Sequence, residues 1–70
     1  MGAGVIQPVE GDIGRHVTYR TRFAVEHGRI TSFNQKVVFV RYYERIEDGH
    51  HSPRYGETSE ATRREDLEWS

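Results

Sequence analysis

Four short stretches rich in apolar, β-branched and aromatic residues, each followed by a turn signal, constrain the fold of this 70-residue chain most strongly. They cover residues 15–23, 29–33, 37–43 and 58–69. Short strands separated by tight turns have few other ways to bury a common face than to curl into one bent sheet. The pattern therefore predicts an all-β domain, a small barrel of about five short strands.

The first stretch alternates with a period of two, as a half-buried strand does. One set of side chains is expected to face the core: Val17, Tyr19, Thr21 and Phe23. The other set is expected to face water: His16, Thr18, Arg20 and Arg22. The stretch 37–43 is the strongest strand prediction, and we expect Val38 and Val40 to point inward there.

Turn signals separate these stretches. Residues 26–28 end in Gly28, which either adopts a positive φ in a turn or allows a neighbouring backbone to approach closely. Asn34 and Gln35 are typical of a hairpin tip. Residues 44–57 are polar and contain two glycines and a proline, so we expect a long mobile loop, a kind that is usually functional or disordered.

The segment 57–68 has two interpretations. The favoured one is a strand with Ala61 inward, then a short 3₁₀ turn over residues 63–66, then a last strand in which Leu67 closes the core. The alternative is a helix, because several of these residues have fair helix propensity. Only Ala61 and Leu67 would be apolar on that helix, which is too few to anchor it.

The ends and the composition complete the expected organisation. Residues 1–10 are expected to form an extended arm with Ile6 or Val9 against the barrel edge, and residues 11–70 the barrel itself. Apolar residues make up only 34% of the chain and charged residues 30%. No cysteine is present to supply a disulfide, so we expect modest stability.

Several short patterns together resemble those of small SH3-like (Tudor/KOW-like) barrels, in particular short proteins encoded by tailed bacteriophages and prophages. The resemblance covers residues 11–69 and rests on Ile13-Gly14-x-x-Val17-x-Tyr19, Glu26-x-Gly28-x-Ile30, Val38-Phe39-Val40-Arg41-Tyr42 and Ala61 with Asp66-Leu67. It implies an SH3-like barrel with a short 3₁₀ turn before the last strand. It implies little about activity, because members of that group largely lack an assigned one.

Charge is distributed unevenly along the chain, although the net charge is only −1. Residues 15–41 contain six arginines and lysines against one acid, whereas residues 42–70 contain four against eight. Such asymmetry can mark a basic face, and the alternative is that neighbouring strands pair opposite charges and cancel the field. A sequence pI near 6.4 argues against strong phosphate binding.

Binding is the function that this composition favours. We expect a small non-enzymatic adaptor or inhibitor that contacts a protein, with nucleic-acid binding or self-association as a weak homodimer as the alternatives. Arginines and tyrosines make efficient anchors in interfaces. The candidate binding residues are His16, Arg20, Arg22, Arg41, Tyr42, Tyr43 and Tyr55, together with the expected loop 44–57.

Other classes of function are disfavoured. The four histidines lack the spacing of a zinc site, so we expect no metal and no cofactor. No serine lies in a nucleophile elbow, and no apolar surroundings raise a carboxyl pKa, so we predict no catalytic residue. No apolar run is long enough to span a bilayer, and the N-terminus lacks the pattern of a secretion signal. We therefore expect a cytoplasmic protein with no membrane contact, and the resemblance to phage proteins implies a bacterial host.

Overall fold

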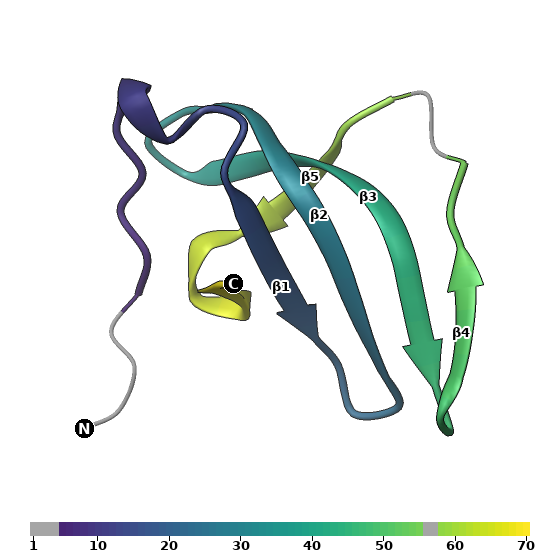
Figure 1. Cartoon of the computed structure of the whole chain (residues 1–70). Helices are drawn as coiled ribbons and strands as arrows, with labels where there is room; N and C mark the ends of the chain where they lie inside the picture. Colours follow the sequence, from purple (N-terminus) through teal and green to yellow (C-terminus); the bar gives the residue numbers. More distant parts are fainter. Residues whose placement is uncertain (1–4, 56–57) are drawn as a thin grey trace.

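The computed structural model describes residues 5–55 and 58–70 and is all-β, with six strands in one antiparallel sheet (Figure 1). In this part of the chain, no helix is long and apolar enough to cross a membrane. The strands are β1 (His16–Arg20), β2 (Ala24–Phe33), β3 (Val37–Glu47), β4 (His50–Pro53), β5 (Glu60–Arg63) and β6 (Leu67–Trp69). Two 3₁₀ turns accompany them, η1 (Glu10–Asp12) and η2 (Arg64–Asp66).

The long strand β3 organises the sheet. The strand order is β4-β3-β2-β1-β6, and β5 pairs with β3. One edge of β3 carries β2, while the other edge carries β5 along residues 37–40 and β4 along residues 44–47. Through η2 the chain passes from β5, on β3, to β6, on β1. Because β5 and β6 are not paired with each other, the sheet is open.

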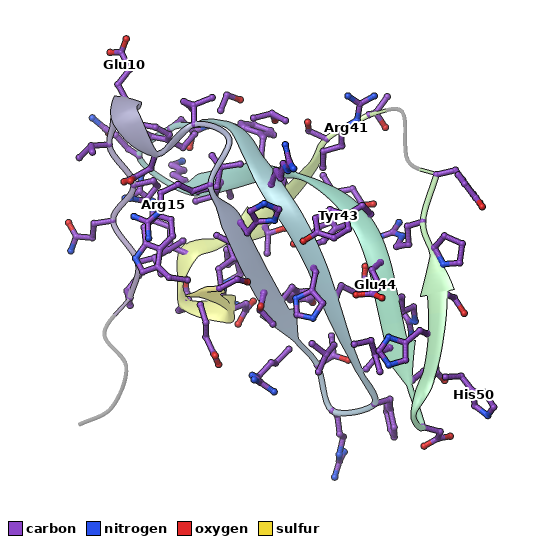
Figure 2. The ribbon with its side chains drawn as sticks, in the orientation of Figure 1. Glu10, Arg15, Arg41, Tyr43, Glu44 and His50 are labelled. Atoms are coloured by element: carbon purple, nitrogen blue, oxygen red, sulfur yellow. The ribbon has the colours of Figure 1, made fainter. Side chains whose placement is uncertain are left out.

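The prediction of a long loop at residues 44–57 is wrong for most of that segment. β3 continues to Glu47, and β4 follows as its hairpin partner. Asp48 and Gly49 form the two-residue turn with φ values of 52° and 76°. Two successive positive φ values match the right-handed twist of a hairpin, which explains why polar residues continue the strand here. His50, the first residue after this turn, projects away from the sheet (Figure 2). Residues 56 and 57 lie outside the described residues.

The first hairpin turns earlier than the alternating pattern predicts. The Thr21 hydroxyl accepts hydrogen bonds from the backbone N–H groups of Phe23 (3.3 Å) and Ala24 (3.0 Å) and so closes the turn after β1. Thr21 and Phe23 therefore leave the strand, and Phe23 is 74% exposed rather than in the core. The prediction that Thr18 faces water is also wrong. Thr18 is buried because β6 packs beside it, and the Ser70 hydroxyl forms a hydrogen bond with the Thr18 hydroxyl at 2.6 Å.

Gly28 lies in the middle of β2, so the expected turn at residues 26–28 is wrong and the alternative of a close approach is confirmed. A Cβ atom at this position would lie 2.5 Å from a Val40 methyl group and 2.8 Å from the Arg41 carbonyl oxygen. The next turn follows the prediction. The Asn34 side-chain oxygen accepts hydrogen bonds from the backbone N–H groups of Lys36 (2.8 Å) and Val37 (2.9 Å), which forms the hairpin tip.

The strand, 3₁₀ turn and strand favoured for the C-terminal segment are confirmed, and the helical alternative is wrong. The inward residue is Thr62, however, and Ala61 is exposed. Thr62 lies opposite Val38 in the register of β3 and β5, and its hydroxyl bonds the Tyr42 hydroxyl at 2.7 Å. A buried threonine that satisfies its hydroxyl in this way replaces the apolar residue that the pattern favoured.

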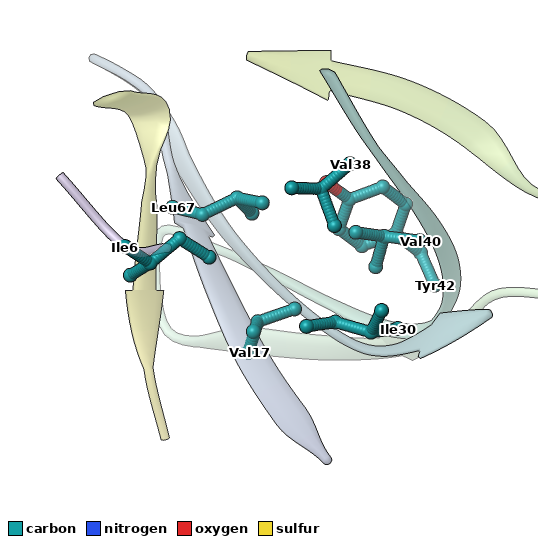
Figure 3. Packing of buried hydrophobic residues seen from close by; sticks show 7 residues of the cluster. All are labelled: Ile6, Val17, Ile30, Val38, Val40, Tyr42 and Leu67. Carbon is teal, nitrogen blue, oxygen red and sulfur yellow. The ribbon is translucent and has the colours of Figure 1, made fainter. Parts of the chain in front are cut away.

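The core lies against the concave side of the bent sheet (Figure 3). Val38 and Val40 point into it as predicted, and Ile6 from the N-terminal segment covers it while Val9 stays exposed. The cluster contains Ile6, Val17, Ile30, Val38, Val40, Tyr42 and Leu67, with Tyr19, Phe33 and Trp69 packed at its margin. We call the opposite side of the sheet the outer face.

Candidate functional site

Three basic side chains form a row across the outer face, which we call the basic row. His16 of β1 lies opposite Arg29 of β2, and Arg29 lies opposite Arg41 of β3. All three residues are exposed. Directly opposed side chains share one face of a sheet, so the three side chains are presented together to a ligand on this face.

A shallow groove of about 740 Å³ surrounds the basic row, and we call it the basic groove. The described residues that line it include three arginines and one histidine but no acid. They are Ile13, Gly14, His16, Arg29, Ile30, Thr31, Arg41, Tyr42, Tyr43 and Arg54. The groove lining therefore lacks an acidic side chain among the described residues, although the net charge of the chain is negative.

Arg29 differs from other arginines of the chain in its pairing. Arg15 pairs with Asp12 at 3.0 Å and Arg20 with Glu68 at 3.1 Å, so these cations are neutralised locally. Arg29 forms no ion pair with any residue in the described ranges. Its guanidinium keeps all its donors available to a ligand, in a geometry that suits bidentate contact with a phosphate or carboxylate.

Tyr43 forms one wall of the basic groove and is the extra residue of a β-bulge. Gly28 lies opposite Tyr42 and His27 opposite Glu44, which leaves Tyr43 without a partner in β2. The Tyr43 hydroxyl bonds Nδ1 of His16 at 2.8 Å, and the two rings meet edge to face at 5.7 Å between centroids. Bulges often re-aim a side chain in this way, and here the ring is held against His16 of the basic row.

A second group of charges, which we call the charge network, lies at the edge of the core. Glu26 is 5% exposed and accepts hydrogen bonds from Arg45 and from Arg54, while Arg54 also bonds Glu60 at 2.6 Å. Partial burial acts to lower the pKa of Arg54, but the carboxylates of Glu26 and Glu60 outweigh it and the pKa lies above its usual value. The network thus fixes Arg54 as a permanent cation at the margin of the basic groove.

Tyr42 lines the groove and also belongs to the core. Its raised pKa predicts that the folded protein loses stability at alkaline pH. Burial raises its pKa from 10.0 to about 12, the Thr62 hydrogen bond opposes this, and Glu26 and Glu60 add to it. In the unfolded chain Tyr42 ionises near pH 10, so the unfolded state is stabilised relative to the folded state as pH rises from 10 to 12. About 3 kcal/mol of stability, present below pH 10, should be lost over this range.

Urea unfolding between pH 8 and pH 12 measures this loss. Tyr42→Phe should cost about 1 kcal/mol at pH 8, because the Thr62 hydroxyl loses its partner, and should then lose less stability than the wild type on the way to pH 12. Tyr55→Phe is the matched control, since Tyr55 is 87% exposed. Equal alkaline losses in the wild type and in Tyr42→Phe would contradict the assignment to Tyr42.

The candidate binding residues separate in the structure. His16, Arg41 and Tyr43 meet in the basic groove. Tyr42 lines it but is only 4% exposed, so its expected place on an exposed aromatic rim is wrong, because β3 keeps the alternation that turns Val38 and Val40 inward. Three candidates lie elsewhere: Arg20 is paired with Glu68, Arg22 is in the turn after β1, and Tyr55 does not line the groove.

Sequence reasoning missed Arg29, Ile13 and Arg54 as groove residues. The excess of bases in residues 15–41 includes Arg29, but only the strand register places it between His16 and Arg41. Arg54 was assigned to the loop that proved to be a hairpin. No sequence signal distinguishes Arg29 from the arginines that pair with acids.

Comparison of the chain with protein-family models, with curated proteins and with solved structures finds no match. The resemblance to SH3-like phage proteins therefore stays a prediction. In the described part of the chain, no three histidine or carboxylate side chains form a group that could hold a metal ion. The basic groove is thus the feature from which a function can be argued.

Proposed function

We propose that the chain is a binding module of the SH3-like barrel type, not an enzyme, and that its basic groove binds nucleic acid. The observation that carries the proposal is the basic row, in which His16, Arg29 and Arg41 lie directly opposite one another on three adjacent strands. Two arginines and a histidine at strand spacing offer a phosphate backbone several contacts at once.

The connectivity supports the SH3-like part of the proposal. β1, β2 and β3 follow one another as antiparallel neighbours, β5 returns to β3, and the single turn η2 leads directly into β6 on β1. The 3₁₀ turn before the last strand is the feature that the resemblance implies. β4 is an addition to this connectivity, paired only with the far half of β3.

The distribution of charge supports nucleic acid over a protein partner. The expected protein interface depended on an exposed rim of tyrosines beside a long loop. Tyr42 is buried and Tyr55 does not line the groove, so Tyr43 is the one exposed tyrosine among the described residues that line it. The groove combines arginines with one exposed aromatic ring, and proteins use this combination to bind single-stranded nucleic acid. A protein partner and self-association stay predictions, as do the phage origin and the cytoplasmic location.

The groove predicts salt-sensitive binding. Binding of a fluorescent oligonucleotide, followed by anisotropy, should weaken steeply between low and physiological salt, because phosphate contacts release counterions. Arg29→Glu and Arg41→Glu should each weaken binding by about tenfold or more and lower the salt slope by about 1. Arg22→Glu is the matched control, since it makes the same charge change outside the groove and should bind nearly as the wild type does.

Two outcomes would contradict this proposal. The first is that the wild type does not bind the oligonucleotide even at low salt. The second is that Arg22→Glu weakens binding as much as Arg29→Glu does, which would mean that net charge and not the groove governs the contact. Circular dichroism on each variant verifies that the fold is retained.

A further inference from the structure

The basic groove offers more than positive charge. Ile13 is 44% exposed and Tyr43 is 42% exposed, and both line the same groove as Arg29. Exposed apolar residues of this size are a cost for a site that holds only phosphate, because a phosphate group makes no favourable contact with them. A ligand that fits the whole groove has an anionic part for the arginines and a flat apolar part for Ile13 and Tyr43.

The Tyr43 ring is held ready for such a flat group. Its hydroxyl is bonded to His16, its ring edge meets the His16 ring, and its backbone carbonyl accepts a hydrogen bond from the Arg54 N–H at 2.9 Å. At Arg41–Tyr43 the edge of β3 lies between the stretch covered by β5 and the stretch covered by β4. A fixed aromatic ring gives contact area at little cost in conformational entropy.

We infer that the basic groove selects single-stranded nucleic acid, with phosphates along the basic row and an unstacked base on the Tyr43 ring against Ile13. This inference rests on the proposed function and narrows its ligand. The basic row spans two interstrand spacings, about 10 Å, which gives a flexible strand room for more than one phosphate contact. A duplex keeps its bases stacked inside, so it offers the groove phosphates but no base for Tyr43.

Three probes of matched length separate the parts of the inference: an oligothymidylate, an abasic oligonucleotide with the same backbone charge, and a duplex. Anisotropy at low salt should show the oligothymidylate binding about 5- to 100-fold more tightly than the abasic strand, the range expected for one stacked base. It should also bind more tightly than the duplex. Equal affinity for the two single strands, or tighter binding of the duplex, overturns the inference and leaves the proposed function standing. Binding of none of the probes overturns both.

Variants of Tyr43 test the stacking independently. Tyr43→Ala should bind the oligothymidylate no more tightly than the abasic strand, whereas Tyr43→Phe keeps the ring and should keep the preference. Tyr55→Ala removes an exposed tyrosine outside the groove and serves as the matched control. If Tyr43→Phe loses as much of this preference as Tyr43→Ala does, the Tyr43 hydroxyl acts through His16, and the inference that a base stacks on this ring is wrong.

Discussion

A Gly28→Val variant is expected to be unfolded at room temperature. The first added carbon alone would lie 2.5 Å from the Val40 side chain and 2.8 Å from the Arg41 carbonyl oxygen, far inside normal contact distance. Val40 is fully buried and the carbonyl belongs to the paired neighbour strand, so neither can move away without disturbing the sheet. Overpacking of a core costs about 1–3 kcal/mol for small additions, and two further methyl groups increase this.

This loss is large against the total stability of such a domain. A single core of this size supplies about 3–5 kcal/mol, so Gly28→Val should lack a cooperative thermal transition, and Gly28→Ala should show a strongly lowered one. Gly11→Ala is the matched control, because a Cβ there meets nothing within 4 Å. A Gly28→Ala protein as stable as Gly11→Ala in urea would show that β2 and β3 do not approach as closely as described.

Loss of the buried carboxylate in the charge network is the second large effect that we expect. Glu26→Ala leaves Arg45 and Arg54 without their shared partner beside the core, and removal of one member of a buried ion pair costs about 3–5 kcal/mol. Both arginines are partly exposed and regain some hydration, so we expect about 3 kcal/mol, the lower end of that range. Urea unfolding measures it directly.

An exposed ion pair provides the comparison. Glu68→Ala removes the partner of Arg20 on the outer face, where both side chains are well exposed, and should cost less than about 1 kcal/mol. Glu26→Gln retains the shape and tests whether charge is needed. If Glu26→Ala and Glu68→Ala lose the same stability, the burial of Glu26 contributes nothing.

The sequence predicted much of the fold because strand patterns and turn chemistry agree over most of the chain. Val38 and Val40 alternate cleanly, Asn34 closes its hairpin, and the C-terminal segment has too few apolar residues for a helix. The errors have local causes. At Thr21 a hydroxyl that closes a turn ended an alternating strand early, and at Thr62 a hydrogen-bonded polar side chain took an inward place.

The candidate site was harder to predict, because it depends on register. The sequence shows that His16 and Arg41 are basic and that Tyr43 is aromatic, and these three predicted binding residues do line the groove. It does not show that Arg29 lies between the first two, since one residue of slippage moves a side chain to the other face. Nor does it show that a bulge displaces Tyr43 and leaves Tyr42 in the core.

The bulge at Tyr43 also determines which changes in length β3 can accept during evolution. It takes up one residue of β3, so that Glu26 faces Arg45; if the same residues paired without a bulge, Glu26 would face Glu44 and Arg45 would face Val25. Deletion of Tyr43 would therefore close the bulge and remove the aromatic wall, but it would keep Glu26 opposite Arg45. Other insertions and deletions should accumulate at the Asp48–Gly49 turn, where the hairpin can lengthen without changing any register behind it.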